Sequence, residues 1–339
     1  MQYDVAFYEV FKEEEEVLRK YLPEGYDYLF TPKSIHETGQ AQPPATMISI
    51  RTQSEIPEVW AGILDGIFTR STGYDHLTRY LQTADQKVPA GYLPKYAARA
   101  VAEQAFLLTL MLMRKIDAQR KAMRHFSRDS LTGAELQGKI LTVIGVGNIG
   151  SELIRIGYGL DMALLGVDIV RRRELVSQFG LQYVPLDTGI ARGNVIICAL
   201  PLTEDTYQLL DYAALSNTSD SSILLNIARG EITPPADLLR LLEEEKLAGV
   251  GIDVFDQEST LGSYLRGEIV LEKIPNNYKR EAVQANLDLI GHPRVIATPH
   301  NAFNTRESTE RKARQTARNV ESFLNDGEFL TPLPEMLQE

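Results

Sequence analysis

The sequence predicts an α/β protein with two doubly wound parallel-sheet domains. Short apolar segments alternate with helix-like segments before residue 100, and the same alternation starts again after residue 138. Strands that are separated by helical connections are typical of parallel sheets. A third observation that supports this fold class is a glycine-rich turn near the start of the second series. The chain of 339 residues is long enough for about two domains, each with its own core.

The first series predicts one parallel sheet. An acidic segment, Glu13 to Tyr21, has the composition of an exposed helix, and its run Glu13–Glu16 is interpreted as a solvated face. The expected strands are Val5–Tyr8, Tyr26–Phe30, Thr46–Ile50 and Gly66–Thr69.

A long apolar helix is predicted from Ala97 to Arg124. Leucine and methionine occur nearly all round it between Leu107 and Met113. A helix of this kind must be buried from several sides, by a domain junction or by a partner subunit. We therefore interpret these side chains as core or interface, and we expect a homodimer.

The second series begins at Gly138 and predicts a complete doubly wound sheet. A polar helix is then predicted from Thr305 to Leu324, packed back on the first domain. The expected strands are Ile140–Gly145, Ala163–Asp168, a weak Gln182–Val184, Val195–Leu200, Ile223–Ile227, Val250–Val254 and Val295–Thr298. One domain would comprise residues 1–100 plus 304–339, and the other residues 101–303.

Composition argues against several classes of protein. The net charge of −11 disfavours binding to nucleic acid or to an anionic membrane surface. No segment approaches the roughly 18 apolar residues of a membrane span, and no targeting segment is recognised, so we expect a cytoplasmic protein. The single cysteine, Cys198, lies in an apolar segment and is interpreted as core. It excludes an internal disulfide and a cysteine-based zinc site, and we predict no metal.

The glycine-rich turn predicts a dinucleotide site. Gly145, Gly147 and Gly150 follow an apolar strand and open a helix. The first glycine allows a tight turn, the second lets the backbone approach a pyrophosphate, and the third lets the helix pack on the strand. The N–H groups of the helix N-terminus can bind the phosphates. Asp168, at the end of the next strand, is placed to hold the ribose diol.

The same region predicts NAD as the cofactor. The carboxylate of Asp168 would repel the 2′-phosphate of NADP, which carries roughly −1.5 to −2 charges. Arg171, Arg172 and Arg173 follow where a clamp for that phosphate could form. NADP is therefore kept as the less favoured alternative.

Arg229, Glu258 and His300 each follow the end of a predicted strand. Because ligands bind at the carboxyl ends of parallel strands, we expect them to converge on one crevice. Arginine can hold a carboxylate with two parallel hydrogen bonds, and histidine can exchange a proton near neutral pH. A nearby glutamate favours the imidazolium and orients the ring. Each residue alone has a structural interpretation, as an ion-pair arginine, a surface acid or a hydrogen-bonded histidine. Their shared position favours catalysis.

These motifs resemble the D-isomer-specific 2-hydroxyacid dehydrogenase family over nearly the whole chain, and its D-lactate dehydrogenase branch in particular. The resemblance implies a discontinuous, flavodoxin-like substrate domain and a Rossmann coenzyme domain. The matching segments are Thr69–His76, Ala100–Glu103, the glycine turn with Asp168, Leu200–Thr206, Asn226–Gly230, Asp253–Glu258 and Thr298–Phe303.

The resemblance also implies residue roles. It assigns catalysis to Arg229, Glu258 and His300. The implied substrate contacts are Thr72, Gly73, Tyr96 and Phe303. The implied cofactor contacts, with Asp253 at the nicotinamide amide, are Gly145, Gly147, Asn148, Ile149, Gly150, Asp168, Leu200, Pro201, Thr206, Ile227, Ala228 and Asp253.

The chain departs from the family pattern at three places. Ser259 follows Glu258 where many members have proline, and Ala199 stands where D-lactate dehydrogenases often have a histidine. The stretch Ser259–Thr298 is a charged, extended loop that carries Tyr264 and Tyr278. Its length resembles the D-lactate dehydrogenase branch more than the glycerate branch.

The implied reaction is the NADH-dependent reduction of a 2-oxo acid to a D-2-hydroxy acid, with His300 as general acid and base. A hydroxypyruvate or glyoxylate reductase is an alternative that differs only in substrate. A non-catalytic NADH-sensing interaction protein is an alternative of another class. The set of Arg229, Glu258 and His300 favours the enzyme, and the sequence leaves the 2-oxo acid open.

Overall fold

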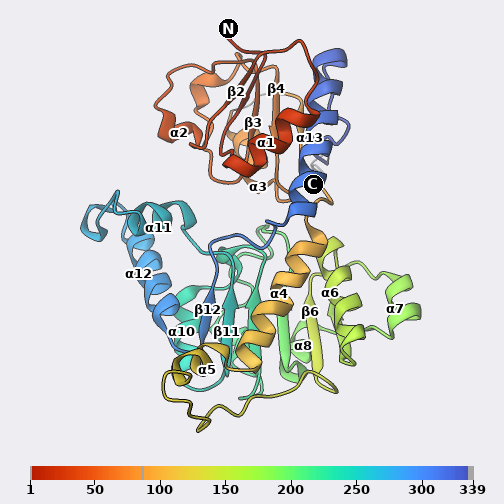
Figure 1. The fold of residues 1–339 in the computed structure, drawn as a ribbon, viewed down its shortest axis with the longest axis vertical. Coiled ribbons are helices and arrows are strands. Elements are labelled where there is room, and N and C mark those ends of the chain that lie inside the picture. Colours follow the sequence, from red (N-terminus) through yellow and green to blue (C-terminus); the bar gives the residue numbers. More distant parts are fainter. Residues whose placement is uncertain (1, 85–87, 335–339) are drawn as a thin grey trace. The chain divides into compact units, whose positions relative to one another are not determined.

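The structure is a computed structural model that describes residues 2–84 and 88–334. The chain folds into two compact units (Figure 1). Unit 1 comprises residues 1–97 with 304–339, and unit 2 comprises residues 98–303.

Unit 1 is built on a five-stranded parallel sheet with the order β2-β1-β3-β4-β5. This order is that of the flavodoxin-like folds and confirms the predicted class. The central strands are buried along their whole length, as expected for a parallel sheet covered on both faces. The strands are β1 (Val5–Phe7), β2 (Tyr28–Phe30), β3 (Met47–Ile50), β4 (Gly66–Thr69) and β5 (Ala90–Gly91).

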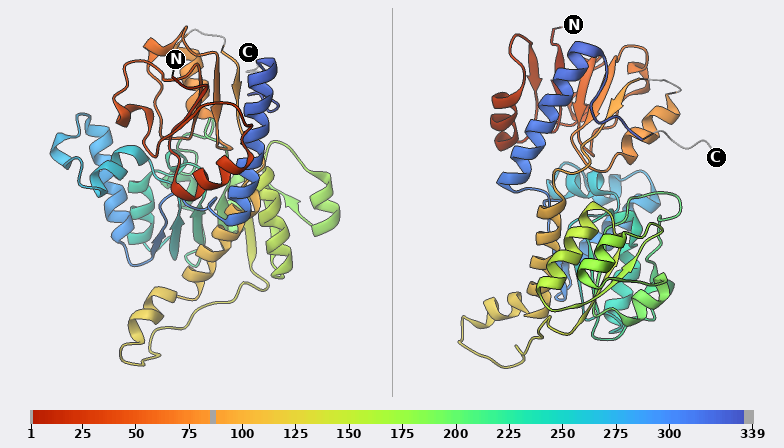
Figure 2. Two further views of the ribbon diagram at one scale, coloured as in Figure 1. Left: turned by 45° about the horizontal axis from the view of Figure 1, so that its top comes forward. Right: turned by 90° about the vertical axis from the view of Figure 1, so that its right-hand side faces the viewer.

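Two helices of unit 1 come from opposite ends of the chain. Helix α13 packs against α1, as expected for the polar helix near the C-terminus (Figures 1 and 2). The helices are α1 (Lys12–Tyr21), α2 (Ile35–Thr38), the short η1 (Glu58–Trp60), α3 (Asp75–Thr83) and α13 (Arg306–Asp326).

The prediction that the run Glu13–Glu16 is wholly solvated is wrong at Glu14, which is fully buried. Its Oε1 accepts a hydrogen bond from Arg70 Nε at 2.9 Å, and it lies 2.6 Å from Lys312 Nζ. These two cations come from the end of β4 and from α13. Burying a carboxylate between α1 and α13 requires such partners, because an unpaired buried charge is very costly.

Unit 2 contains a seven-stranded parallel sheet with the order β12-β11-β10-β9-β6-β7-β8. All seven predicted strands are present. The order runs outward in both directions from β6, as in a Rossmann fold, so the switch point lies between β6 and β9. The strands are β6 (Ile140–Ile144), β7 (Ala163–Val167), β8 (Gln182–Tyr183), β9 (Val195–Cys198), β10 (Ile223–Asn226), β11 (Gly249–Ile252) and β12 (Val295–Ala297).

Helices cover the sheet of unit 2 in two groups. Helix α4 packs on α6 and contacts β10, β11 and β12, whereas α10 packs on α9 and α12 (Figure 1). The helices are α4 (Ala98–Met113), α5 (Ile116–Ala122), α6 (Asn148–Gly159), α7 (Arg173–Phe179), α8 (Leu186–Arg192), α9 (Tyr212–Leu215), η2 (Gly230–Ile232), α10 (Pro235–Glu243), α11 (Glu258–Leu265), η3 (Leu271–Lys273) and α12 (Asn277–Gly291).

Two predictions about these helices are wrong. The single helix from Ala97 to Arg124 is broken into α4 and α5, because Lys115 adopts the left-handed conformation with φ 51°. The stretch Ser259–Thr298 is not an extended loop, since most of it lies in α11, η3 and α12. Helix α5 and the segment after it project away from the sheet of unit 2 (Figure 2).

The apolar surface of α4 is only partly covered within the chain. Leu108 and Met113 are buried, but Leu107 is 51% exposed and Leu110 is 42% exposed. Within residues 2–84 and 88–334, no helix has the length and apolarity needed to cross a membrane.

Candidate active site

The turn after β6 requires glycine at two positions for steric reasons. Gly145 has φ 94°, and a Cβ there would lie 2.7 Å from the carbonyl carbon of Ala199. A Cβ on Gly150 would lie 2.1 Å from the carbonyl oxygen of Gly145. These contacts close the turn and pack α6 against the strand, as the spacing predicts.

Gly147 differs from Gly145 and Gly150 because, apart from its two chain neighbours, no heavy atom of the described residues lies within 4 Å of the position of its Cβ. The backbone is therefore open at the N-terminus of α6, which begins at Asn148 and continues through Ile149. Unpaired N–H groups at a helix N-terminus attract anions. The open backbone and the helix end together fit the pyrophosphate of a dinucleotide.

Asp168 lies at the end of β7, next to this turn. Its Oδ2 accepts a hydrogen bond from the N–H of Val146 at 2.6 Å, and its Oδ1 accepts one from the N–H of Val170 at 2.7 Å. The predicted ribose-binding acid thus also fastens the glycine turn to the neighbouring strand. The sequence carries no signal for this second role.

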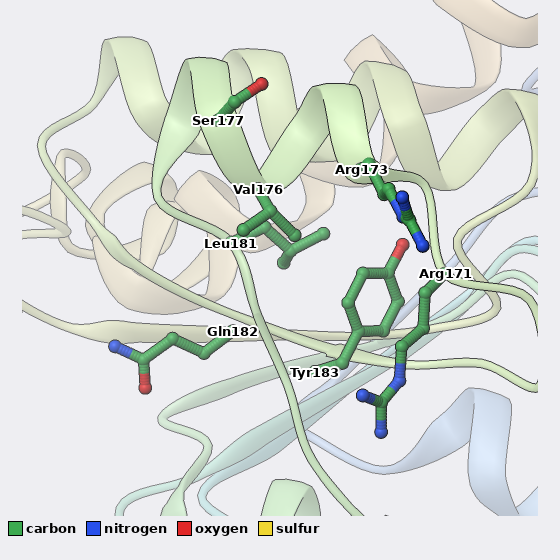
Figure 3. Close-up of a pocket in the computed structure, with 7 residues that line it drawn as sticks. All are labelled: Arg171, Arg173, Val176, Ser177, Leu181, Gln182 and Tyr183. Carbon is green, nitrogen blue, oxygen red and sulfur yellow. The ribbon is translucent and has the colours of Figure 1, made fainter.

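A pocket follows Asp168 along the chain, and two of the three predicted arginines line it. Figure 3 shows Arg171 and Arg173 beside the ring of Tyr183. The hydroxyl of Tyr183 accepts a hydrogen bond from the N–H of Arg172 at 3.0 Å. The remaining lining residues are Val176, Ser177, Leu181 and Gln182.

The turn that carries Arg229 is shaped by Asn226, the fully buried last residue of β10. Asn226 Nδ2 donates to the carbonyl oxygen of Arg229 at 2.9 Å and to Thr233 Oγ1 at 2.7 Å. Asn226 Oδ1 accepts the N–H of Ala228 at 3.0 Å. Asparagine often closes turns in this way. The position of Asn226 at the start of the segment Asn226–Gly230 is the sequence signal that could have predicted this role.

Gly230 brings the Arg229 turn against the loop after β11. A Cβ on Gly230 would lie 1.9 Å from the carbonyl carbon of Phe255, so only glycine fits here. The guanidinium of Arg229 is half-buried, and its Nη1 donates to the carbonyl oxygen of Ala228 at 2.8 Å. Arg229 is thereby held close to the segment that leads to Glu258.

Glu258 and His300 are in direct contact. His300 Nδ1 lies 2.8 Å from Glu258 Oε1 and 3.0 Å from Oε2, and both side chains are 24% exposed. Glu258 is the first residue of α11, and His300 has φ 49° in the turn after β12. An imidazole that is oriented by a carboxylate and open to solvent can donate and accept protons.

Asp253 holds the turn that carries His300. Its Oδ1 accepts the N–H of Asn301 at 2.9 Å and the hydroxyl of Thr298, and its Oδ2 accepts the N–H of Ala302 at 2.8 Å. The side chain is almost completely buried. Burial raises the pKa of the Asp253 carboxyl, and these hydrogen bonds together with the charge of His300 oppose the rise.

The remaining predicted cofactor and substrate contacts of unit 2 lie in the segments that follow β9, β10 and β12. Thr206 Oγ1 donates to the carbonyl oxygen of Pro201 at 2.7 Å and so closes the turn after Leu200. Ile227, Ala228 and Phe303 are buried.

Three of the predicted substrate residues, Thr72, Gly73 and Tyr96, belong to unit 1. Thr72 and Gly73 form the turn after β4, where Ser71 Oγ donates to the carbonyl oxygen of Gly73 at 2.7 Å. Tyr96 is buried, and its carbonyl oxygen accepts a hydrogen bond from Arg311 Nε at 2.8 Å.

Comparison with known proteins identifies the class. The family described as D-isomer specific 2-hydroxyacid dehydrogenase, NAD binding domain, matches residues 106–302. The D-lactate dehydrogenase of Escherichia coli is 31% identical over 238 residues, which cover 70% of this chain and 69% of that protein. The glyoxylate reductase of Pyrococcus furiosus is 26% identical over 325 residues, which cover 93% of this chain and 85% of that protein.

A solved structure agrees. The D-lactate dehydrogenase of Aquifex aeolicus, complexed with NAD and lactic acid, superposes with a TM-score of 0.80 at 27% identity, covering 96% of this chain and 99% of that one. The chain belongs to the D-isomer-specific 2-hydroxyacid dehydrogenases, and it contains their NAD-binding domain.

Proposed function

We propose that the protein uses NADH to reduce a 2-oxo acid to a D-2-hydroxy acid, in the manner of a D-lactate dehydrogenase. The contact between Glu258 and His300 is the observation that carries this proposal. NADH, when bound, supplies the hydride. The protein must then supply a proton to the developing alkoxide and a cation for the substrate carboxylate.

His300 is the proton donor in this proposal. Its Nδ1 faces Glu258, so Nε2 is the nitrogen that exchanges the proton with the substrate oxygen. Glu258 stabilises the imidazolium until transfer, and Arg229 binds the carboxylate and polarises the carbonyl. In the oxidative direction, His300 accepts the hydroxyl proton.

The resemblance to the family supports four substrate contacts in the same proposal. The backbone N–H groups of Thr72 and Gly73 bind the substrate carboxylate, while Tyr96 and Phe303 contact the rest of the substrate. Variants of Tyr96 and Phe303 should therefore change the ranking of substrates by side-chain size.

In this proposal the glycine turn would hold the pyrophosphate of the cofactor, Asp168 its ribose and Asp253 its nicotinamide amide. We propose NAD over NADP because Asp168 would repel a 2′-phosphate. The backbone hydrogen bonds that fix Asp168 support this choice, since the carboxylate cannot easily turn away. Measuring kcat/KM with NADH and with NADPH tests it.

The proposed reaction is tested with a panel of 2-oxo acids of increasing side-chain size. NADH oxidation with pyruvate or larger 2-oxo acids, giving the D-product, supports the proposal. Preferential turnover of glyoxylate or hydroxypyruvate supports the reductase alternative, which the relative from Pyrococcus furiosus favours. NADH binding with no turnover of any panel member supports the sensor and overturns the enzyme proposal.

We further propose that the protein is a homodimer. The exposed Leu107 and Leu110 of α4 support an interface between two copies, because burying such side chains is favourable. Light scattering on the wild type and on Leu107→Glu tests this point, with a monomeric wild type as the contradicting result.

A further inference from the structure

Helix α12 fastens the segment that leads to Glu258. Tyr278, near the start of α12, donates its hydroxyl hydrogen to Asp256 Oδ2 at 2.7 Å. Asn286, two turns further along the same helix, donates from Nδ2 to the carbonyl oxygen of Asp256 at 2.8 Å. Side chain and backbone of Asp256 are thus both held by one helix.

Asp256 has little freedom of its own. It is 4% exposed, and its Oδ1 accepts a hydrogen bond from Gln257 Nε2 at 3.0 Å. Gln257 has φ 55° and immediately precedes Glu258, which begins α11. A left-handed residue at this point fixes the direction in which Glu258 leaves the turn.

The hydroxyl of Tyr278 also joins a longer chain of hydrogen bonds. Since this hydroxyl donates to Asp256, it can only accept from Tyr207, whose oxygen lies 3.2 Å away. Tyr207 in turn accepts from Gln208 Nε2 at 3.3 Å. The backbone N–H of Gln208 donates to the carbonyl oxygen of Glu231 at 2.9 Å. The chain of hydrogen bonds therefore connects the loops that follow β9, β10 and β11.

We propose that Tyr278 is a positioning residue, which holds Glu258 against His300 by way of Asp256. This role rests on the proposed function of the Glu258–His300 pair. Tyr278 is hydrogen-bonded to Asp256 and Tyr207, and it lies in the segment between the two members of that pair. The segment Ser259–Thr298 thereby has a use in the reaction, as the support of the carboxylate that orients the histidine.

The variant Tyr278→Phe removes only the hydroxyl group. We expect kcat to fall about tenfold, less than the hundredfold that a 1 Å misplacement can cost. We expect the Kd for NADH to be unchanged, because Tyr278 is hydrogen-bonded to Asp256 and Tyr207, and neither is a proposed cofactor contact. The matched control is Tyr212→Phe, which removes another tyrosine hydroxyl that donates to a carboxylate, Glu244, at 2.6 Å.

The kinetic constants separate positioning from a merely structural role. If Tyr278→Phe loosens Glu258, the proton-transfer step slows, so kcat should fall while KM for the 2-oxo acid stays unchanged. Adding Tyr278→Phe to Asp256→Asn should have less effect than Tyr278→Phe alone, because both changes act on one hydrogen bond.

A measurement that does not depend on activity distinguishes failure of the proposed function from failure of the positioning role. The imidazole signal of His300 can be identified by NMR from its loss in His300→Gln, among five histidines, and its chemical shift at one fixed pH should change in Tyr278→Phe but not in Tyr212→Phe. If the wild type reduces no 2-oxo acid, the proposed function fails while this chemical shift still tests the positioning. An active wild type whose Tyr278→Phe variant matches Tyr212→Phe in kcat and in this chemical shift overturns the positioning role.

Discussion

His300 and Glu258 are separated by 42 residues, yet the imidazole Nδ1 lies 2.8 Å from the carboxylate Oε1. Each stands in its own turn, after β12 and after β11. Asp253 holds the first turn by three hydrogen bonds, and Asp256 and Gln257 lead into the second. The protein's own turns therefore hold the pair from both sides, as the proposed proton transfer requires.

The first prediction concerns Glu258. In Glu258→Gln, the ring of His300 keeps a hydrogen-bonding neighbour of the same size but loses its anionic partner. The kcat for reduction should fall about tenfold or more, because the ring loses the anion that orients it for proton transfer. Steady-state kinetics on both proteins measures this. An unchanged kcat would contradict the role of Glu258.

The second prediction concerns Arg229. Arg229→Lys keeps the charge but cannot form two parallel hydrogen bonds to a carboxylate. We expect mainly a rise in KM for the 2-oxo acid, about tenfold or more. Steady-state kinetics measures it, with Arg240→Lys on the exposed surface of α10 as the matched control. Equal KM values in the two variants would remove Arg229 from substrate binding.

The third prediction concerns cofactor choice. Asp168→Asn removes the carboxylate charge, while its side-chain oxygen can still accept a backbone N–H group. The ratio of kcat/KM for NADPH to that for NADH should rise about tenfold or more, since repulsion of the 2′-phosphate is lost and Arg171 and Arg173 remain. A wild type that already prefers NADPH would show that these arginines outweigh Asp168.

The fourth prediction concerns the buried charges of unit 1. Glu14→Gln leaves Arg70 and Lys312 without a buried anion and should cost about 3–5 kcal/mol of unfolding free energy. Lys312→Met should cost less, because Arg70 still pairs with Glu14 and burial lowers the pKa of Lys312 to about 7. Denaturant titrations on the three proteins give these differences. A larger loss in Lys312→Met would contradict the assignment.

This fourth effect has a defined pH dependence. Burial alone would raise the pKa of Glu14, but Lys312, Arg70 and Arg51 outweigh it and lower the pKa from 4.5 to about 2. A carboxyl whose folded-state pKa is lowered stabilises the fold above its unfolded pKa, and loses this contribution as the pH falls. The difference between the wild type and Glu14→Gln should therefore shrink between pH 4.5 and pH 2.

The sequence predicted the parts of this molecule whose causes are local. Six of the seven strands of unit 2 were predictable because each is a short apolar run, whereas the seventh, Gln182–Tyr183, gave only a weak signal. The glycine turn was predictable because Gly145 and Gly150 are needed by their own close contacts. Short strands without an apolar run, such as Ala90–Gly91, carry no such signal.

What the sequence could not predict depends on partners that are distant in the chain. The burial of Glu14 depends on Arg70 and Lys312, which no local pattern connects to it. Likewise, the hydrogen bond between Asp256 and Tyr278 exists only because α12 folds back over the end of β11. The positive φ of Lys115 separates α4 from α5, and no glycine or proline at this point of the sequence predicts it.

The most direct test of the central claim is the turnover of His300→Gln, measured beside its Kd for NADH, with the 2-oxo acid that the wild type reduces best. Since general acid–base catalysis is worth about 10²–10⁴ in rate, turnover should fall at least hundredfold. NADH binding should be unchanged, because the proposed cofactor contacts stay intact. Turnover equal to that of the wild type would show that another group supplies the proton.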